Sequence, residues 1–342
     1  MSSDTAAPLV ATPSGTSARW RGSLLSWDVA IVMILLAVLV VASIDVEGFA
    51  SGRNVAFGVL DLAPILLIAL PMTMIVVTGA IDLSVASTLG LASATMGALW
   101  QGGMSIQMII PLCIVLGAAL GAVNGVFICV LRLPSLAVTI GTLALFRGLA
   151  FVVLGDSAVA DFPLSYTSWV TGMIGSTSIP TILMPLVLLA AVFALVLHAT
   201  PFGRSLFAMG AGEEAATFTG VRVARTRFLL YVTCGAASGL AGVLWTLRYS
   251  SARADNGNGL ELAVVAAVLL GGVSIFGGKG SLGGVIAGVL LLVSLQNALR
   301  LADVSNDALT VVTGLLLIVS VLAPNAAGAV RDSVGRRRIR PD

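Results

Sequence analysis

The chain has 342 residues, of which 58% are hydrophobic and only 10% are charged, whereas an average soluble domain is about half apolar and about a quarter charged. This composition excludes an ordinary soluble enzyme, a disordered protein and a nucleic-acid binder. The net charge of +2 indicates no particular partner. One histidine and three cysteines without CxxC spacing argue against a metal centre or a disulfide framework.

Long apolar runs begin at Trp27 and continue almost to the C-terminus. A membrane-spanning helix needs about 20 apolar residues, so the sequence predicts an all-α polytopic membrane protein with about ten spans. The predicted spans cover residues 28–44, 58–79, 83–100, 106–131, 135–154, 180–199, 228–247, 261–277, 283–299 and 308–323. The expected organisation is a cytoplasmic tail over 1–26, a permease domain over 27–324 and a basic cytoplasmic tail over 325–342.

The distribution of basic residues sets the expected orientation. With the N-terminus inside, 13 Lys and Arg residues fall in inner segments and four in outer ones, as the positive-inside rule requires. An even number of spans places both termini in the cytoplasm. The long loop over 155–179 is then external, and we expect an interfacial or re-entrant helix in its middle. The loop over 200–227 is internal.

Two glycine-rich breaks resemble each other. Residues 79–84 follow the second span, and residues 271–278 end the eighth. The halves of the chain that contain these breaks would enter the membrane from opposite sides. Their similarity therefore suggests inverted repeats, between which transporters often place their pathway.

The inner loop over 200–227 contains the pattern E-A-A-x-x-x-G, from Glu213 to Gly220. Acidic residues favour a helix N-terminus and glycine favours its C-terminal end, so the pattern predicts a short helix. Such a helix could dock into a partner, or it could be a plain surface helix. Its place in the long, basic inner loop favours docking.

This pattern resembles the coupling helix of ATP-binding-cassette importer permeases, and other motifs narrow the resemblance to the ribose-type sugar permeases. Residues 78–87 resemble "GGIDLSVGS", with Ala80 and Ala86 in place of glycines. Residues 133–148 resemble "PxFIxTLGT…RG", and 261–281 follow the family pattern in order. The resemblance covers about residues 57–324.

The resemblance implies a type II-like permease with ten helices. It implies two permease subunits in a complex (a homodimer or a pair with a paralogue), ATPase subunits on the cytoplasmic side, and an extracytoplasmic solute-binding protein. The expected location is a bacterial cytoplasmic membrane, and the expected cargo is a monosaccharide-like solute, rhamnose-like or autoinducer-2-like before ribose-like. Coupling to the ATPase is expected at Glu213, Glu214, Ala215, Ala216 and Gly220.

Several residues could take part in transport or could serve structure alone. Asp82 with Ser84 could line a pathway or cap the next helix. Asn124 could bind solute, although the spacing of Gly117, Gly121 and Gly125 favours close helix packing. Further candidates from the family motifs are Thr139, Thr142, Arg147, Gly271, Gly272, Gly277 and Gly278.

Other charged residues also leave two interpretations open. Asp61 and Arg147 lie inside apolar runs, where they could line a polar pathway or form pairs within the bundle. Arg248, Arg253 and Asp255 could dock the binding protein or form salt bridges at the rim. His198 is expected to be a solvated helix-end residue rather than a ligand.

The chain is not expected to be an enzyme. Residues 277–281 read GGKGS, which fails the phosphate-loop pattern G-x-x-x-x-G-K-[ST], and no catalytic residue, metal or cofactor is expected. ATP and Mg²⁺ should act on a partner chain. The alternative is a secondary transporter driven by an ion gradient, which would need carboxylates within the membrane as ion sites.

Overall fold

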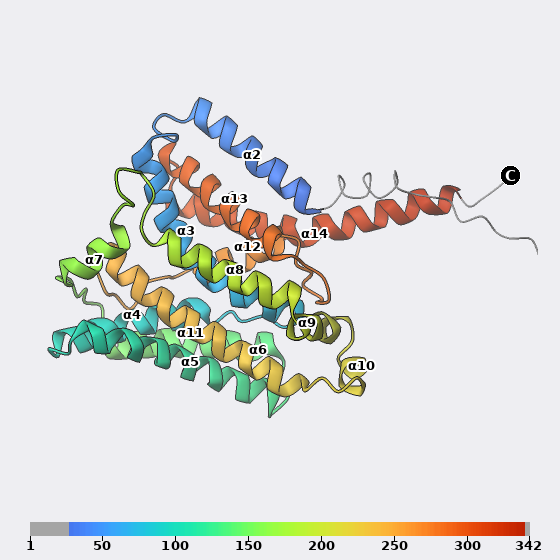
Figure 1. The fold of residues 1–342 in the computed structure, drawn as a ribbon, viewed down its shortest axis with the longest axis horizontal. Coiled ribbons are helices and arrows are strands. Elements are labelled where there is room, and N and C mark those ends of the chain that lie inside the picture. Colours follow the sequence, from blue (N-terminus) through green and yellow to red (C-terminus); the bar gives the residue numbers. More distant parts are fainter. Residues whose placement is uncertain (1–26, 339–342) are drawn as a thin grey trace, which may run out of the picture.

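The computed structural model describes residues 27–338, and within this range the chain is helical apart from loops and isolated β-bridges. The helices are α2 (Trp27–Asp45), α3 (Gly52–Val77), α4 (Val85–Gln101), α5 (Ile106–Cys129), α6 (Ser135–Leu154), α7 (Leu164–Thr171), α8 (Leu183–Ala199), α9 (Pro201–Ala211), α10 (Glu213–Phe218), α11 (Val223–Tyr249), α12 (Leu260–Leu270), α13 (Leu282–Leu301) and α14 (Asn306–Arg338) (Figure 1). The predicted tail over 1–26 lies outside the described residues. The end of α14 falls in the predicted tail over 325–342.

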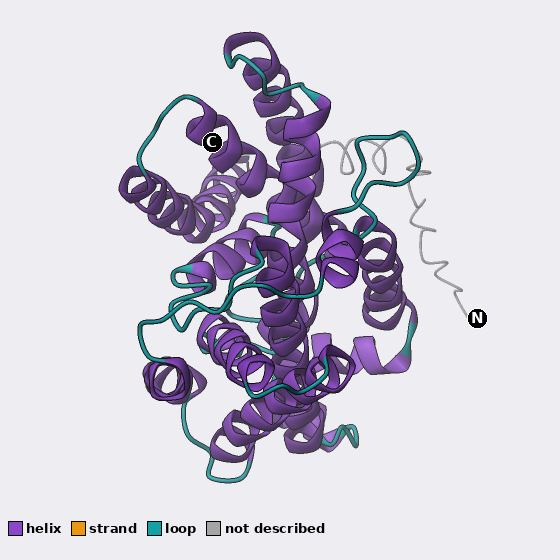
Figure 2. Cartoon of the chain, turned by 90° about the vertical axis from the view of Figure 1, so that its left-hand side faces the viewer, coloured by secondary structure: helices purple, strands orange, loops and turns teal. Residues whose placement is uncertain are grey.

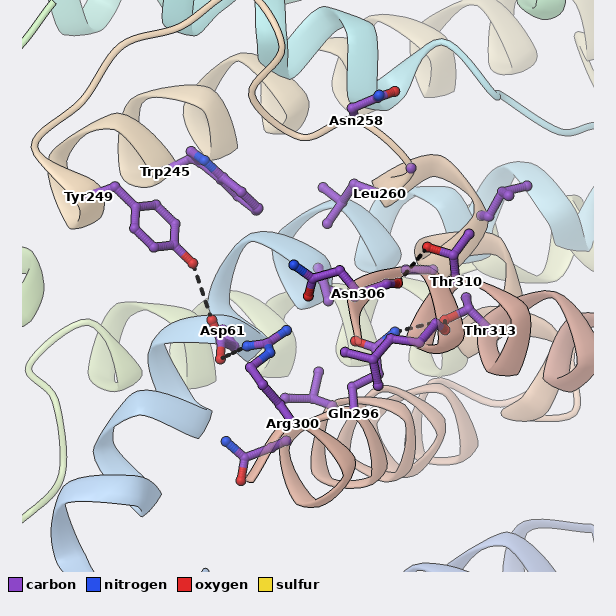
Figure 3. Close-up of a pocket in the computed structure, with 17 residues that line it drawn as sticks. Asp61, Trp245, Tyr249, Asn258, Leu260, Gln296, Arg300, Asn306, Thr310 and Thr313 are labelled. Carbon is purple, nitrogen blue, oxygen red and sulfur yellow. Dashed lines mark hydrogen bonds and ion pairs between the residues drawn. The ribbon is translucent and has the colours of Figure 1, made fainter. Parts of the chain in front are cut away.

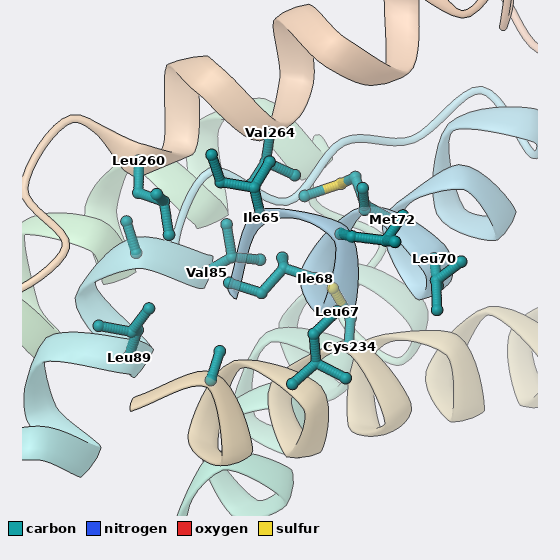
Figure 4. Packing of buried hydrophobic residues seen from close by; sticks show 14 of the residues in the cluster. Ile65, Leu67, Ile68, Leu70, Met72, Val85, Leu89, Cys234, Leu260 and Val264 are labelled. Carbon is teal, nitrogen blue, oxygen red and sulfur yellow. The ribbon is translucent and has the colours of Figure 1, made fainter. Parts of the chain in front are cut away.

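Helix α3 forms the centre of the bundle. Every residue from Leu62 to Val77 is buried, which requires a helix that is apolar on all sides. Helix α11 packs against one side of it, with α4, α5 and α6 beyond, and α12 and α13 pack against the other, with α2 and α14 beyond (Figure 1). Figure 2 shows the same helices and their connecting loops in a view turned by 90°. Figure 4 shows Ile68 and Met72 of α3 between Val264 of α12 and Cys234 of α11.

The outer surface of the bundle is also apolar. Exposed large hydrophobic side chains are found on α2, α5, α6, α8 and α14, including Val41, Val152 and Leu188. In water such a surface would favour aggregation, whereas lipid solvates it. The chain is therefore an all-α polytopic membrane protein.

Each predicted span contains a helix, but the helices differ in how well they suit a full crossing. Six of those in the described residues are long and apolar enough to cross alone, and α8 with α9 makes a seventh if the bent pair counts as one span. Helix α12 has 11 residues and ends at Leu270, so the predicted span over 261–277 is too long. Helix α4 has 17 residues and buries Ser87, Thr88 and Ser93. The total of ten membrane spans stays a prediction.

The predicted helix within the loop over 155–179 is present as α7, whose Leu164 and Trp169 are exposed. The loop between α8 and α11 contains two short helices. Pro201 disfavours helical backbone at Thr200, so the chain bends by 66° there, and the Thr200 hydroxyl accepts a hydrogen bond from the Gly203 N–H at 3.2 Å to begin α9. We call the end of the bundle that carries α10 the α10 end, and the opposite one the α7 end.

Helices α5 and α11 pack backbone to backbone. A Cβ on Gly121 would strike the Tyr231 carbonyl oxygen, and one on Gly117 would strike that of Gly235. The glycine spacing of α5 therefore serves close packing, as small residues do at helix interfaces in membranes.

Substituting Gly121→Ala should lower the melting temperature of the purified chain in detergent by several degrees. The added methyl group forces the two helices apart, and overpacking of this kind costs about 1–3 kcal/mol. The matched control is Gly141→Ala in α6, where a Cβ meets no atom within 4 Å. It should melt at or slightly above the wild-type temperature. Equal melting of the two variants would contradict this account of the interface.

Candidate functional site

The break between α3 and α4 holds a buried polar cluster. The Asp82 carboxylate is 1% exposed, and its Oδ1 accepts hydrogen bonds from the Ser84 backbone N–H at 2.9 Å and the Ser84 hydroxyl at 2.7 Å. From α5, the Asn124 amide donates to the Ser84 hydroxyl at 2.7 Å. The structure thus brings Asp82, Ser84 and Asn124 together, and Asp82 holds the turn from which α4 starts.

Neighbouring helices fix this break from outside. The Tyr231 hydroxyl of α11 donates to the Ile81 carbonyl at 3.2 Å, and the Ile81 N–H donates to the Ser135 hydroxyl at 3.4 Å. The Asn124 Oδ1 is buried and lacks a hydrogen-bond partner among the described residues. A movement of α5, α6 or α11 would therefore act on Ile81 or Ser84, on either side of Asp82.

The two glycine-rich breaks touch each other. The Gly278 N–H donates a hydrogen bond to the Val77 carbonyl at 2.8 Å, which satisfies an oxygen at the C-terminal end of α3. Gly277 and Gly278 have φ of 83° and 73°, values that favour glycine. Gly210 of α9 lies on this contact, because a Cβ there would strike both the Val77 oxygen and the Gly278 nitrogen.

The other two glycines of the second break pack against different helices. A Cβ on Gly271 would meet the Val285 backbone of α13, and one on Gly272 would meet the Trp27 ring of α2. The Trp27 indole N–H donates to the Leu270 carbonyl at 2.8 Å. The second break is thereby enclosed by α2, α9 and α13.

Helix α10 projects from the bundle at the α10 end. Ala216 is 2% exposed and holds the helix to the molecule, whereas Phe218 is 91% exposed. Glu213 forms a salt bridge with Arg227 of α11 at 2.8 Å. Glu214 and Ala215 are exposed, and Gly220 turns the chain back with φ of 89°. An exposed phenylalanine beside an exposed carboxylate is typical of a contact surface.

A cavity of about 860 Å³ opens beside α10, and we call it the arginine cavity. Gly79 and Ala80 of the first break form part of its wall, together with Cys129 and Ser135. The remaining lining is strongly basic and includes Arg132, Arg222, Arg225 and Arg227. The cavity therefore connects α10 with the segment that carries Asp82.

The candidates on α6 serve the bundle. The Thr139 and Thr142 hydroxyls are buried and donate to carbonyls of their own helix, those of Ser135 and Val138. Arg147 donates to the Ala254 and Asn256 carbonyls at 2.6 and 2.9 Å. Arg147 thus clamps the loop between α11 and α12 and does not pair with Asp61.

Asp61 forms ion pairs within the bundle near the α7 end. Arg248 lies 2.5 Å from its carboxylate and Arg300 3.5 Å from it, and the Tyr249 hydroxyl donates to it at 3.5 Å. Of the two interpretations of Asp61, pairing is what the structure shows, although the pair also faces a cavity. Arg248 is largely buried by this contact.

Arg253 and Asp255 are exposed and form a salt bridge at 2.8 Å, the rim arrangement that the sequence left open. The hydrogen bond from Arg253 lowers the pKa of the Asp255 carboxyl. Because both side chains are exposed, this pair adds little stability and stays accessible to another molecule. At the α10 end, the His198 Nε2 accepts a hydrogen bond from the Leu282 N–H at 3.1 Å, a helix-end contact.

A second cavity, of about 260 Å³, lies at the α7 end (Figure 3), and we call it the aromatic cavity. Trp245 and Tyr249 of α11 line one side of it, with their ring centroids 5.3 Å apart. Asn306 and Thr310 of α14 line the other, and Asp61 and Arg300 lie between the two sides.

Sequence reasoning missed two features of these sites. Phe218 does not stand out in the sequence, although it lies within the pattern E-A-A-x-x-x-G, because that pattern draws attention to the acidic residues and the glycine. The aromatic cavity was not predicted either, because its walls come from α3, α11, α12, α13 and α14. The i, i+4 spacing of Trp245 and Tyr249 places both rings on one helix face and was the available signal.

Replacing Asp82 should distinguish a capping role from a charge-dependent one. Asp82→Asn keeps the acceptor Oδ1 for both bonds from Ser84, so we expect its melting temperature to stay close to wild type. Asp82→Ala removes the acceptor and should lose about 1 kcal/mol, the usual cost of a lost cap. Thermal unfolding of the two purified variants measures this, and a large loss in Asp82→Asn would show that the charge itself holds the turn.

Comparisons with known proteins agree with the sequence motifs. The family model of the branched-chain amino acid transport system permease component matches residues 54–321. The autoinducer 2 import system permease protein LsrD of Photorhabdus luminescens is 33% identical over 317 residues, which cover 89% of this chain and 95% of the relative. LsrD of Escherichia coli K12 is 33% identical over 324 residues, covering 92% and 98%. No solved structure matches significantly. The chain therefore belongs to this family of membrane permease components of transport systems.

Proposed function

We propose that this permease is the membrane subunit of an ATP-driven importer for a monosaccharide-like solute. In the proposed complex, two permease subunits form the channel, as a homodimer or with a paralogue. ATPase subunits bind at the α10 end, and an extracytoplasmic solute-binding protein delivers cargo at the α7 end. The names of the relatives, autoinducer 2 import permeases, support a solute of this class.

The proposed location is a bacterial inner membrane with both termini in the cytoplasm. The excess of basic residues at the α10 end, in the loop that precedes α11, supports this orientation. The chain itself performs no hydrolysis in this proposal. ATP and Mg²⁺ act on the partner ATPase, and this chain holds no cofactor.

The observation that carries the proposal is the surface of α10. Phe218 offers an apolar contact that the described residues leave 91% exposed, and Glu214 offers a charge next to it. Aromatic side chains that enter a partner's groove supply much of the affinity in protein interfaces. The salt bridge between Glu213 and Arg227 links α10 to α11.

The buried carboxylates argue against a transporter driven by an ion gradient. A proton or sodium site needs a carboxylate that can exchange its partner during transport. Asp61 is neutralised by Arg248 and Arg300, and the Asp82 carboxylate is committed to the turn at Ser84.

The coupling route proposed here runs from α10 through α9 to the two breaks. Gly212 joins α10 to α9, and Gly210 of α9 lies on the hydrogen bond between Val77 and Gly278. A force on α10 therefore acts on the point where both breaks meet, one of which leads to Asp82 and α4.

Removing the contact surface of α10 should uncouple the importer. We expect Phe218→Ala and Glu214→Ala each to lower ATPase retention by the purified permease and ATP-dependent uptake of a radiolabelled sugar panel at least tenfold, about 1.4 kcal/mol of binding. The matched control is Val152→Ala, an 81% exposed side chain on α6 that should face lipid. All three variants should express and melt like wild type. Unchanged retention and uptake in both α10 variants would refute docking at α10.

A methyl group at Gly210 should block transmission without removing the docking surface. Gly210→Ala places a Cβ against the Val77 oxygen and the Gly278 nitrogen, so α9 must move away from the breaks. We expect ATPase retention to stay near wild type while sugar uptake per ATP hydrolysed falls several-fold. Gly314→Ala in α14, where no atom lies within 4 Å of a Cβ, is the control. Wild-type coupling in Gly210→Ala would contradict the route.

A further inference from the structure

The aromatic cavity combines flat apolar surfaces with uncharged polar groups. The rings of Trp245 and Tyr249 are one helical turn apart, and both side chains are partly exposed to the cavity. A sugar ring presents C–H groups on its faces and hydroxyl groups at its edge. The C–H groups pack on aromatic faces, whose negative potential they complement, so the aromatic pair supplies one half of a sugar site.

Two asparagine amides supply the polar half of this sugar site. Asn258, in the loop before α12, and Asn306, the first residue of α14, both line the cavity, and neither side chain has a hydrogen-bond partner among the described residues. Each amide offers two N–H donors and a carbonyl acceptor, which suits hydroxyl groups that both donate and accept. Gln296 and Thr310 line the same wall but bond to Thr313 and to the Asn306 carbonyl respectively.

The charges at this site favour a neutral ligand. The charged lining of the aromatic cavity is one carboxylate and one guanidinium, those of Asp61 and Arg300, which pair with each other, whereas Arg248 holds Asp61 from the neighbouring cavity. The ammonium group of a zwitterionic amino acid would have to compete with two guanidinium groups for Asp61, the carboxylate in the cavity lining. A polyhydroxy solute needs only the free amides and the rings.

A neighbouring cavity offers an approach to this site. It measures about 450 Å³, and Asp61, Tyr249, Asn297 and Arg300 line both cavities. Arg248 also lines it, and the Arg248 Nη1 is buried without a hydrogen-bond partner among the described residues. Both cavities lie at the α7 end, opposite the helix that we propose to bind the ATPase.

We propose that the aromatic cavity is a polyol-binding site, in which a neutral monosaccharide-sized solute stacks on Trp245 and Tyr249 and hydrogen-bonds to Asn258 and Asn306. The site would receive cargo from the binding protein before translocation. This inference rests on the proposed import function and adds the place where the solute binds and the residues that select it. It also distinguishes a sugar permease from an amino-acid permease of the same family.

The test measures binding to the full-length chain alone, reconstituted in nanodiscs without ATPase or binding protein. The probes are L-rhamnose, D-ribose and 4,5-dihydroxy-2,3-pentanedione, with L-leucine as the amino-acid comparator, followed by saturation-transfer difference NMR. At least one of the three polyols should bind, and leucine should not. Trp245→Ala and Asn306→Ala should each weaken that binding about tenfold or more, the loss expected when a stacking face or a hydrogen-bonding amide is removed.

Matched variants at the same end of the bundle control for general effects. Trp169→Ala removes an exposed aromatic ring from α7, and Gln107→Ala removes an exposed amide from α5. Both should bind the polyol as wild type does. Asn306 is exposed, so its alanine variant should keep the wild-type melting temperature. If Trp245→Ala melts early, Trp245→Phe replaces it and should keep part of the binding.

Three results would overturn the site: no polyol binds to the wild-type chain, leucine binds in preference, or the cavity variants bind as tightly as wild type. These outcomes are separable from failure of the proposed function, which is measured in the complex by ATPase retention and uptake. Loss of uptake in Phe218→Ala together with unchanged binding in Trp245→Ala would leave the importer intact and remove only the site.

Discussion

The hydrogen bond from the Gly278 N–H to the Val77 carbonyl joins the two breaks near the α10 end of the bundle. The end of a helix leaves carbonyl groups without partners, and a buried one such as that of Val77 is costly if it stays unpaired. Here the end of α3 is satisfied by the break that follows α12, so each break supports the other. The positions of α4, Asp82 and α9 all depend on this contact. Only glycines at 210, 277 and 278 allow the backbones to come so close.

The charged residues are arranged differently at the two ends of the bundle. At the α7 end, the charged lining of the aromatic cavity is one carboxylate and one guanidinium, those of Asp61 and Arg300, which pair with each other beside neutral amides. At the α10 end, arginines outnumber carboxylates around the arginine cavity. The first arrangement suits recognition of an uncharged solute. The second gives the α10 end the basic character that the positive-inside rule associates with cytoplasm.

The helices could be predicted because long apolar runs are a strong signal, whereas the breaks could be located only in part. The segment after Leu270 stays apolar while its glycines end the helix, and hydropathy alone therefore extends the span too far. The link between Asp82 and Ser84 followed from local capping preferences. The Arg147 clamp on the Ala254 and Asn256 carbonyls did not, because it joins positions more than 100 residues apart.

At the candidate sites, too, features encoded locally could be predicted, whereas those that depend on packing between distant segments could not. The helix at Glu213 is encoded locally, and the sequence predicts it, but the exposure of Phe218 depends on how α10 sits against α11. The aromatic cavity depends on five helices meeting at one end. Arg248 could be assigned to the rim or to docking from sequence, and only the packing of α3 against α11 shows that Asp61 holds it.

The three cysteines differ in solvent exposure, so that one of them can report on a change in conformation. Cys113 and Cys234 are fully buried between helices, whereas Cys129 is partly exposed and lines the arginine cavity. A water-soluble maleimide would consequently label the wild-type chain at a single position. Its rate of reaction would follow the widening and narrowing of that cavity as nucleotide is added, without any engineered residue.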